Sequence, residues 1–146
     1  MIQTIELADD DDTAGLGRRI AGLLREGDLV LLQGDLGAGK TALARAIIRA
    51  RVDDALLDVP SPSFALVQPY EAKGRPILHA DLYRLTDPRE VDELGLFERA
   101  DAIVLVEWPE RSDEVAAQAS VRVALTVPPD GAGRTATVEF MDGRAL

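Results

Sequence analysis

Apolar residues recur at helical spacing in two parts of the chain. In the first part they are Leu16, Ile20, Leu23 and Leu24. Their spacing of three or four positions predicts a helix with one buried side, ended by Gly27. The acidic run at 9–12 precedes this helix, and negative side chains stabilise a helix N-terminus, so we interpret the run as a helix start and not as a metal or partner site. Leu43, Ile47 and Ile48 predict a second amphipathic helix.

Strand patterns occupy much of the remaining chain. Unbroken apolar runs at 29–32 and 102–106 predict strands buried on both faces. Alternating or mixed patterns predict further strands at 2–7, 64–70, 76–82, 121–127 and 136–140. A turn at Lys73-Gly74 separates two of these strands, and a turn at 128–133 makes the last two an antiparallel hairpin.

One more helix is predicted to begin at Pro88, with Asp87 as its N-cap and with Val91, Leu94 and Phe97 on one face. No internal repeat, low-complexity tract or interdomain linker interrupts the pattern. Strands that alternate with helices, followed by a hairpin, predict one α/β domain over residues 1–146 with a mixed sheet.

Composition narrows the possible functions. With 16 basic against 26 acidic residues and a net charge of −10, the chain is a poor binder of nucleic acid by itself. It has no cysteine and one histidine, His79, which excludes disulfides, thiolate zinc sites, a cysteine nucleophile and a poly-histidine metal site. No secretory signal is present at the N-terminus and no apolar run could span a bilayer, so we expect a cytoplasmic protein without membrane contact.

The segment Gly34-Asp35-Leu36-Gly37-Ala38-Gly39-Lys40-Thr41 matches the P-loop pattern G-x-x-x-x-G-K-[ST]. Its glycines allow backbone N–H groups to surround an anion, and the helix that follows adds its positive N-terminal end. The lysine is expected to reach the terminal phosphates, and the threonine hydroxyl to bind magnesium. A predicted strand and a predicted helix flank the motif, as a P-loop requires. The expected fold is therefore a P-loop NTPase-like three-layer domain whose sheet has a parallel core and antiparallel hairpins.

A P-loop enzyme also needs a carboxylate across the phosphates. Glu107 ends one buried strand and is the better candidate, and Asp81 near the end of another is the second. A GTPase is excluded because neither lysine lies in an Asn-Lys-x-Asp motif, which would recognise the base. The residues at 92–95 match a switch-type Asp-x-x-Gly motif, but they fall within a helical pattern and are interpreted as helix surface. A small-molecule kinase normally adds a lid and an acceptor pocket, for which this short chain leaves little room.

Four segments occur in a specific order: the P-loop, Ser61-Pro62-Ser63-Phe64, His79-Ala80-Asp81-Leu82-Tyr83-Arg84-Leu85 and Glu107-Trp108-Pro109-Glu110. Together they resemble the TsaE family, also called YjeE, the bacterial ATPases of tRNA threonylcarbamoyladenosine biosynthesis. The P-loop alone marks a vast superfamily, and the second pair of segments makes the match narrow.

This resemblance implies a protein that binds ATP and Mg²⁺ and hydrolyses ATP weakly by itself. It also implies partners, the TsaB and TsaD proteins, which complete the transfer of the threonylcarbamoyl group to adenosine 37 of tRNA. Contact with tRNA would then be indirect, and the role of hydrolysis would be to reset or regulate the complex.

The resemblance also assigns residues to roles. Catalysis would depend on Lys40, Asp81 and Glu107, and the metal would be held by Thr41, Glu107 and Asp81. The nucleotide would contact Gly34, Gly37, Ala38, Gly39, Lys40, Thr41, Ala42, Trp108, Gly133 and Arg134. The segment at 61–64 is similar to a switch-like loop near the γ-phosphate.

Some positions depart from the family pattern or stay open. Ala42 stands where the family commonly has a second threonine, so any role of that hydroxyl is absent; Ser63 replaces a usual threonine but retains a hydroxyl, and Ala80 replaces a bulkier residue. His79 is interpreted as a hydrogen-bonded structural residue in preference to a proton shuttle. Tyr83 and Arg84 face a partner or clamp the sheet edge, and the sequence does not distinguish the two.

Three functions compete at this point. The favoured one is an ATPase that drives a cycle in the tRNA-modifying assembly. The alternatives are a nucleotide-gated binding module in which hydrolysis is incidental, and a small-molecule kinase.

Overall fold

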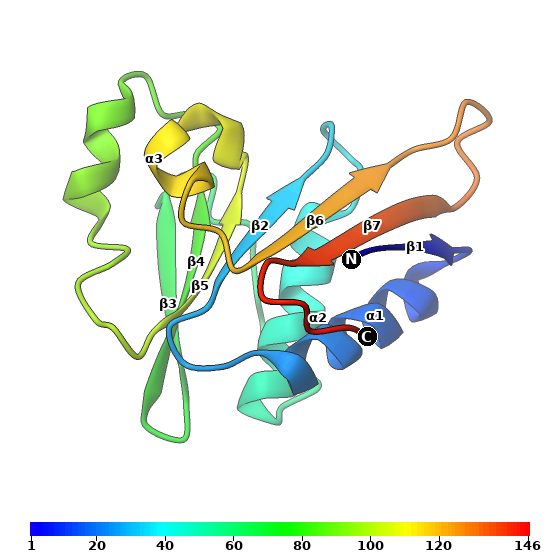
Figure 1. Ribbon diagram of the computed structural model, residues 1–146, viewed down its shortest axis with the longest axis horizontal. Helices are drawn as coiled ribbons and strands as arrows, with labels where there is room; N and C mark the ends of the chain where they lie inside the picture. The colour runs from blue at the N-terminus through cyan, green and yellow to red at the C-terminus, as the bar shows by residue number, and fades with distance from the viewer.

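The predicted strands join into one seven-stranded sheet in the computed structural model, which describes residues 1–146 (Figure 1). In chain order the strands are β1 (Ile2–Leu7), β2 (Leu29–Gln33), β3 (Val67–Ala72), β4 (Arg75–Asp81), β5 (Ile103–Glu107), β6 (Val121–Thr126) and β7 (Arg134–Phe140). Across the sheet they follow the order β1-β7-β6-β2-β5-β4-β3.

The middle of this sheet is parallel and its margins are antiparallel. Strand β2 pairs in parallel with both β5 and β6, and β5 pairs in parallel with β4. The pairs β1–β7, β6–β7 and β3–β4 are antiparallel, which confirms the mixed sheet and the final hairpin. Because parallel strands end at the same edge, the loops that follow β2, β4 and β5 come together there.

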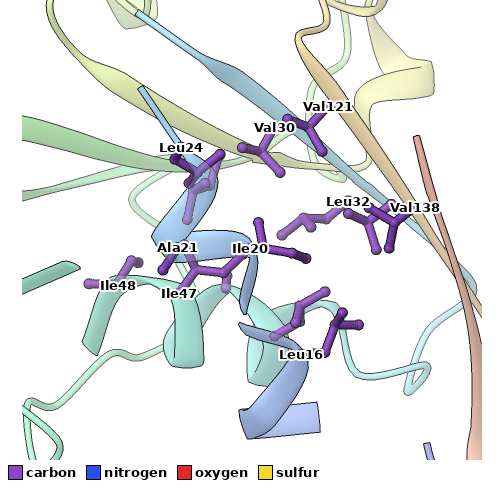
Figure 2. Close-up of a cluster of buried hydrophobic side chains, with 14 of the residues drawn as sticks. Leu16, Ile20, Ala21, Leu24, Val30, Leu32, Ile47, Ile48, Val121 and Val138 are labelled. Atoms are coloured by element: carbon purple, nitrogen blue, oxygen red, sulfur yellow. The ribbon is translucent and has the colours of Figure 1, made fainter. Parts of the chain in front are cut away.

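Two helices cover one face of the sheet. Helices α1 (Asp10–Leu23) and α2 (Lys40–Val52) lie side by side in Figure 1. Figure 2 shows their apolar side chains meeting those of β2, β6 and β7 in the larger of two buried clusters. The helices approach closely at Gly17, where an added Cβ would lie 2.4 Å from the Cβ of Ala46.

Short segments cover the opposite face. They are the 3₁₀ helices η1 (Pro88–Leu94) and η2 (Pro109–Arg111) and the one-turn helix α3 (Asp113–Ala116). Val91 and Val115 from this layer join a second buried cluster with Leu31, Val104 and Val106 of the sheet. The three-layer arrangement is thus confirmed, and none of the helices has the length and apolarity needed to cross a membrane.

Three details of the sequence-based prediction were wrong. The first helix ends before Gly27, because Leu24 already has extended backbone angles and buries its side chain. The third strand begins at Val67 and not at Phe64, because Leu66 takes a φ of 67° and donates its N–H to the carbonyl of Pro62 at 2.7 Å, which closes a turn.

The third error concerns the helix at Pro88. Asp87 caps it as predicted, in a reciprocal capping box with Glu90, but the segment is 3₁₀ and ends at Leu94. The three-residue repeat of a 3₁₀ helix would keep residues 91, 94 and 97 on one face, but the helix stops before Phe97 because Gly95 turns the chain with a φ of 68°. Phe97 therefore does not continue the buried face of Val91 and is 42% exposed.

Candidate nucleotide-binding site

The P-loop connects the end of the central strand β2 to the first residue of α2. Gly34, Gly37 and Gly39 have φ values of 151°, 79° and 104°, which side-chain-bearing residues rarely adopt. An added Cβ at Gly34 would lie 2.7 Å from the carbonyl oxygen of Leu125, whereas at Gly37 it would meet open space. Gly39 precedes α2 without any side-chain capping bond, so the first N–H groups of the helix are open to an anion.

Lys40 is buried beneath this loop. Its Nζ donates to the carbonyl oxygen of Gly34 and, at 3.0 Å, to that of Asp35, and it lies 4.1 Å from the centre of the Trp108 ring. Burial lowers the pKa of Lys40, while the negative charges of Glu107 and Glu110 act in the opposite direction. The ammonium is thus fixed within the loop that would surround a phosphate.

Thr41 and Glu107 bring the P-loop and β5 into direct contact. The Thr41 hydroxyl lies 2.9 Å and 3.0 Å from the two carboxylate oxygens of Glu107, to which it donates. Glu107 is the last residue of β5 and is 2% exposed, and its Oε2 lies 2.6 Å from Nε2 of His79. Two of the three residues predicted to hold magnesium, Thr41 and Glu107, are therefore in direct contact, although they are far apart in the chain.

Asp81 ends the next strand, β4, beside Glu107 in the sheet register. Its Oδ1 accepts the N–H of Tyr83 at 2.9 Å, and it makes no hydrogen bond to Lys40 or Thr41. Burial raises the pKa of Asp81, and the nearby charge of Glu107 adds to this, whereas the bond from Tyr83 opposes it. A carboxylate with a raised pKa is the stronger base, which suits a proton acceptor.

A cavity of about 430 Å³ lies between these groups. It is lined by Leu36, Gly37, Gly39, Lys40, Thr41, Ala42, Ser61, Ser63, Asp81, Tyr83, Arg84, Glu107 and Trp108. It thus unites most of the predicted site residues with Ser61 and Ser63 of the segment at 61–64. Gly34 lies outside the lining, and Ala38 is buried under the loop. A larger cavity of about 520 Å³ lies along α1 and α2, and Ala42 is its only predicted site residue.

The final hairpin meets the P-loop through Arg134. Its guanidinium donates to the carbonyl oxygen of Gly37 at 3.2 Å. Gly133 has a different environment, since an added Cβ would lie 2.7 Å from the carbonyl oxygen of Leu7. Close packing against β1 explains the glycine there, and a nucleotide contact of either residue stays a prediction.

The side chains around the cavity mouth include features that sequence reasoning missed. Trp108 has a left-handed φ of 58°, a strained conformation for a bulky residue, and stands before Pro109. Its ring packs against Tyr83 at 4.8 Å between centroids, while the guanidinium of Arg84 lies 4.4 Å from the centroid of the exposed Phe64 ring. Tyr83 and Arg84 therefore belong to the cavity mouth.

The donor set fits the phosphates of a nucleotide with a magnesium ion. No group of three or more His, Cys, Asp or Glu side chains is placed to hold a metal by itself. Mg²⁺ commonly takes one or two protein oxygens and fills its other positions with water and substrate phosphates. Thr41 and Glu107 offer such oxygens next to an uncapped helix start and a buried ammonium.

Comparison with known proteins identifies similar chains. The family model described as "Threonylcarbamoyl adenosine biosynthesis protein TsaE" matches residues 7–136. The tRNA threonylcarbamoyladenosine biosynthesis protein TsaE of Rickettsia conorii is 42% identical over 105 residues, covering 71% of this chain and 59% of that protein. The protein of the same name from Streptomyces coelicolor is 38% identical over 112 residues, covering 75% and 76%.

Some of these relatives are longer than this chain. The aligned part spans only about three fifths of the Rickettsia conorii protein and of the Haemophilus influenzae TsaE, which is 38% identical over 99 residues and covered to 61%. Among solved structures, YdiB of Bacillus subtilis superimposes with a TM-score of 0.72 at 21% identity, covering 94% of this chain and 84% of that one. At this identity the likeness shows a common fold.

Proposed function

The chain belongs to the TsaE family, and from this premise we propose that it is a magnesium-dependent P-loop ATPase acting in tRNA threonylcarbamoyladenosine biosynthesis. The observation that carries the proposal is the bond from Thr41 to Glu107. It joins the P-loop hydroxyl to the carboxylate at the end of β5 beside the buried ammonium of Lys40. Nucleotide hydrolysis by a P-loop protein requires these three groups together.

The proposed roles follow from chemistry and position. Lys40 would exchange its carbonyl partners for phosphate oxygens, and the open N–H groups at the start of α2 would hold the remaining phosphate charge. Thr41 and Glu107 would hold magnesium, which neutralises charge on the terminal phosphates when bound. Asp81 would accept a proton from water or support the metal through water, since burial raises its basicity.

Nucleotide contacts beyond the phosphates are proposed for the surrounding residues. Trp108 lies over the ammonium of Lys40 and offers an aromatic surface at the cavity. Arg134 approaches the loop from the final hairpin, next to Gly133. Gly34, Gly37, Ala38, Gly39 and Ala42 would contribute backbone groups around the phosphates.

Partners and location belong to the same proposal. The chain would act in the cytoplasm with TsaB and TsaD, and its hydrolysis would drive or regulate their cycle. A net charge of −10 repels a polyanion, so tRNA would be met through the partners and not by this chain alone.

Replacing Lys40 with Ala tests the nucleotide site. One charge-assisted contact is worth roughly 1.5–3 kcal/mol, so we expect ATP affinity to fall about 10- to 100-fold in titration calorimetry. Lys73→Ala is the matched control, because Lys73 is the only other lysine and is exposed in the β3–β4 turn, away from the cavity. Unchanged affinity in the Lys40 variant would refute the P-loop assignment.

A turnover assay with and without TsaB and TsaD separates the ATPase from the alternatives. The ATPase proposal expects partner-stimulated phosphate release and loss of tRNA modification when this protein is omitted. Unstimulated turnover, with modification supported by a hydrolysis-dead variant, would favour a nucleotide-gated module. Phosphoryl transfer to an added small-molecule acceptor would instead indicate a kinase.

A further inference from the structure

His79 is a buried polar residue that the proposed mechanism has not yet used. It lies on β4 with no exposed surface, in the parallel part of the sheet. Its Nε2 is 2.6 Å from Oε2 of Glu107, whereas its Nδ1 has no hydrogen-bond partner. An aliphatic residue at this position would avoid the unpaired nitrogen, so packing alone does not account for a histidine.

The hydrogen-bond pattern assigns the proton between the two ring nitrogens. An ionised carboxylate only accepts hydrogen bonds, so Nε2 is the nitrogen that donates to Glu107. The unpaired Nδ1 is then the acceptor, and a buried acceptor without a partner costs less than a buried N–H without one. His79 is thereby a fixed N–H donor aimed at one oxygen of Glu107.

Glu107 is therefore held from two sides. The Thr41 hydroxyl contacts both carboxylate oxygens from the P-loop, and His79 contacts Oε2 from β4. Thr41 is itself a proposed magnesium ligand, so its bond to Glu107 would have to adjust when the metal binds. His79 is not a proposed magnesium ligand and projects from β4, which pairs with β5, so its bond to Glu107 need not be given up when the metal binds.

We propose that His79 is a positioning residue that fixes the Glu107 carboxylate for magnesium binding. This inference rests on the proposed function, because it assumes that Glu107 serves the metal. Hydrogen-bond donors behind a metal-binding carboxylate or histidine commonly change metal affinity or activity about 10- to 100-fold when removed.

Two substitutions separate positioning from packing. His79→Leu introduces an apolar side chain of moderate size that has no hydrogen-bond donor. His79→Gln places an amide N–H at about the position of the Nε2 donor. The measurement is the Mg²⁺ concentration that half-saturates MgADP binding, followed by the fluorescence of Trp108, the only tryptophan in the chain. ADP affinity in EDTA and the thermal unfolding midpoint are recorded alongside.

We expect the half-saturating Mg²⁺ concentration to rise about 10- to 100-fold in His79→Leu and to return most of the way to wild type in His79→Gln. ADP affinity in EDTA should change less than about twofold in both variants, because the donor acts through the carboxylate and the metal. If His79→Leu does not fold, His79→Asn replaces it, since the shorter amide cannot reach Oε2.

If His79→Leu has the same half-saturating Mg²⁺ concentration as the wild-type protein, the role of His79 is overturned and the proposed function still stands. Equal losses in the Gln and Leu variants would do the same, since they would indicate a packing role. Absence of any Mg²⁺ response in the wild-type protein would overturn the proposed function together with this inference.

Discussion

Replacing Glu107 with Gln removes one negative charge from the site while keeping the length and shape of the side chain. In the wild-type protein the carboxylate accepts the Thr41 hydroxyl at 2.9 Å and 3.0 Å and lies 2.6 Å from Nε2 of His79. An amide keeps one acceptor oxygen and turns the other position into a donor. Because Thr41 and His79 both lie within hydrogen-bond distance of Oε2, an amide oxygen at that position can still accept from both. What the Gln side chain loses is the negative charge that strengthens these bonds and would hold Mg²⁺.

The size of the effect follows from what the amide loses. A hydrogen bond to a charged partner contributes roughly 1.5–3 kcal/mol, and 1.36 kcal/mol corresponds to a tenfold change in rate. We therefore expect Mg²⁺-dependent ATP turnover to fall about 10- to 100-fold. ADP affinity without Mg²⁺ should change less than threefold, about 0.6 kcal/mol, because Lys40 and the glycine loop remain intact.

The assay compares phosphate release with ADP calorimetry in EDTA for wild type, Glu107→Gln and Glu110→Gln. Glu110 is the matched control: it also contributes negative charge near Lys40, but it is exposed and does not contact Thr41. Loss of turnover in both variants would show that net charge, and not the bond to Thr41, explains the result. Full turnover in Glu107→Gln together with its loss in Asp81→Asn would reverse the assigned ranking of the two acids.

Two further predictions concern stability. Gly17→Ala should lower the free energy of unfolding by about 1–3 kcal/mol, because the new Cβ would lie 2.4 Å from the Cβ of Ala46. Gly22→Ala in the same helix meets open space and should raise the free energy of unfolding by about 0.5–1 kcal/mol. Equal effects of the two substitutions in urea denaturation would contradict the close helix contact. The second prediction concerns Asp81 in EDTA. Because its pKa is raised, the folded protein keeps the proton of this carboxyl at pH values where the unfolded chain has released it. The stability that this group contributes is therefore present below about pH 4 and is lost as the pH rises through the folded pKa. Asp81→Asn should therefore gain stability relative to wild type on going from about pH 4 to pH 7, and urea titrations with no such trend would show that the carboxyl is not desolvated.

The sequence predicts those parts of the fold in which neighbouring residues decide the outcome. The apolar runs of β2 and β5 are buried on both faces, and the acidic residues after Asp9 begin α1, because these features depend on local pattern and helix electrostatics. The start of β3 was misplaced for the opposite reason. The residues at 64–66 resemble a strand in composition, but the bond from Leu66 to Pro62 closes a turn that no periodicity reveals.

The same distinction holds for the site. The P-loop is contiguous, so its glycines, Lys40 and Thr41 could be identified together, and strand ends pointed to Glu107 and Asp81. The bond between His79 and Glu107 depends on the pairing of β4 with β5, and the left-handed backbone of Trp108 depends on the chain turning before Pro109. Both features arise from tertiary contacts, which a single sequence does not display.

The two bonds from Lys40 to the carbonyls of its own loop have a kinetic consequence. A loop that its own lysine already holds in shape needs no slow ordering step when an anion arrives, so association is governed by diffusion and orientation. An arriving anion must compete with the two carbonyls for the ammonium of Lys40, and the bonds to the carbonyls form again when the anion leaves. The loop therefore needs no separate ordering step, either when an anion binds or when it leaves.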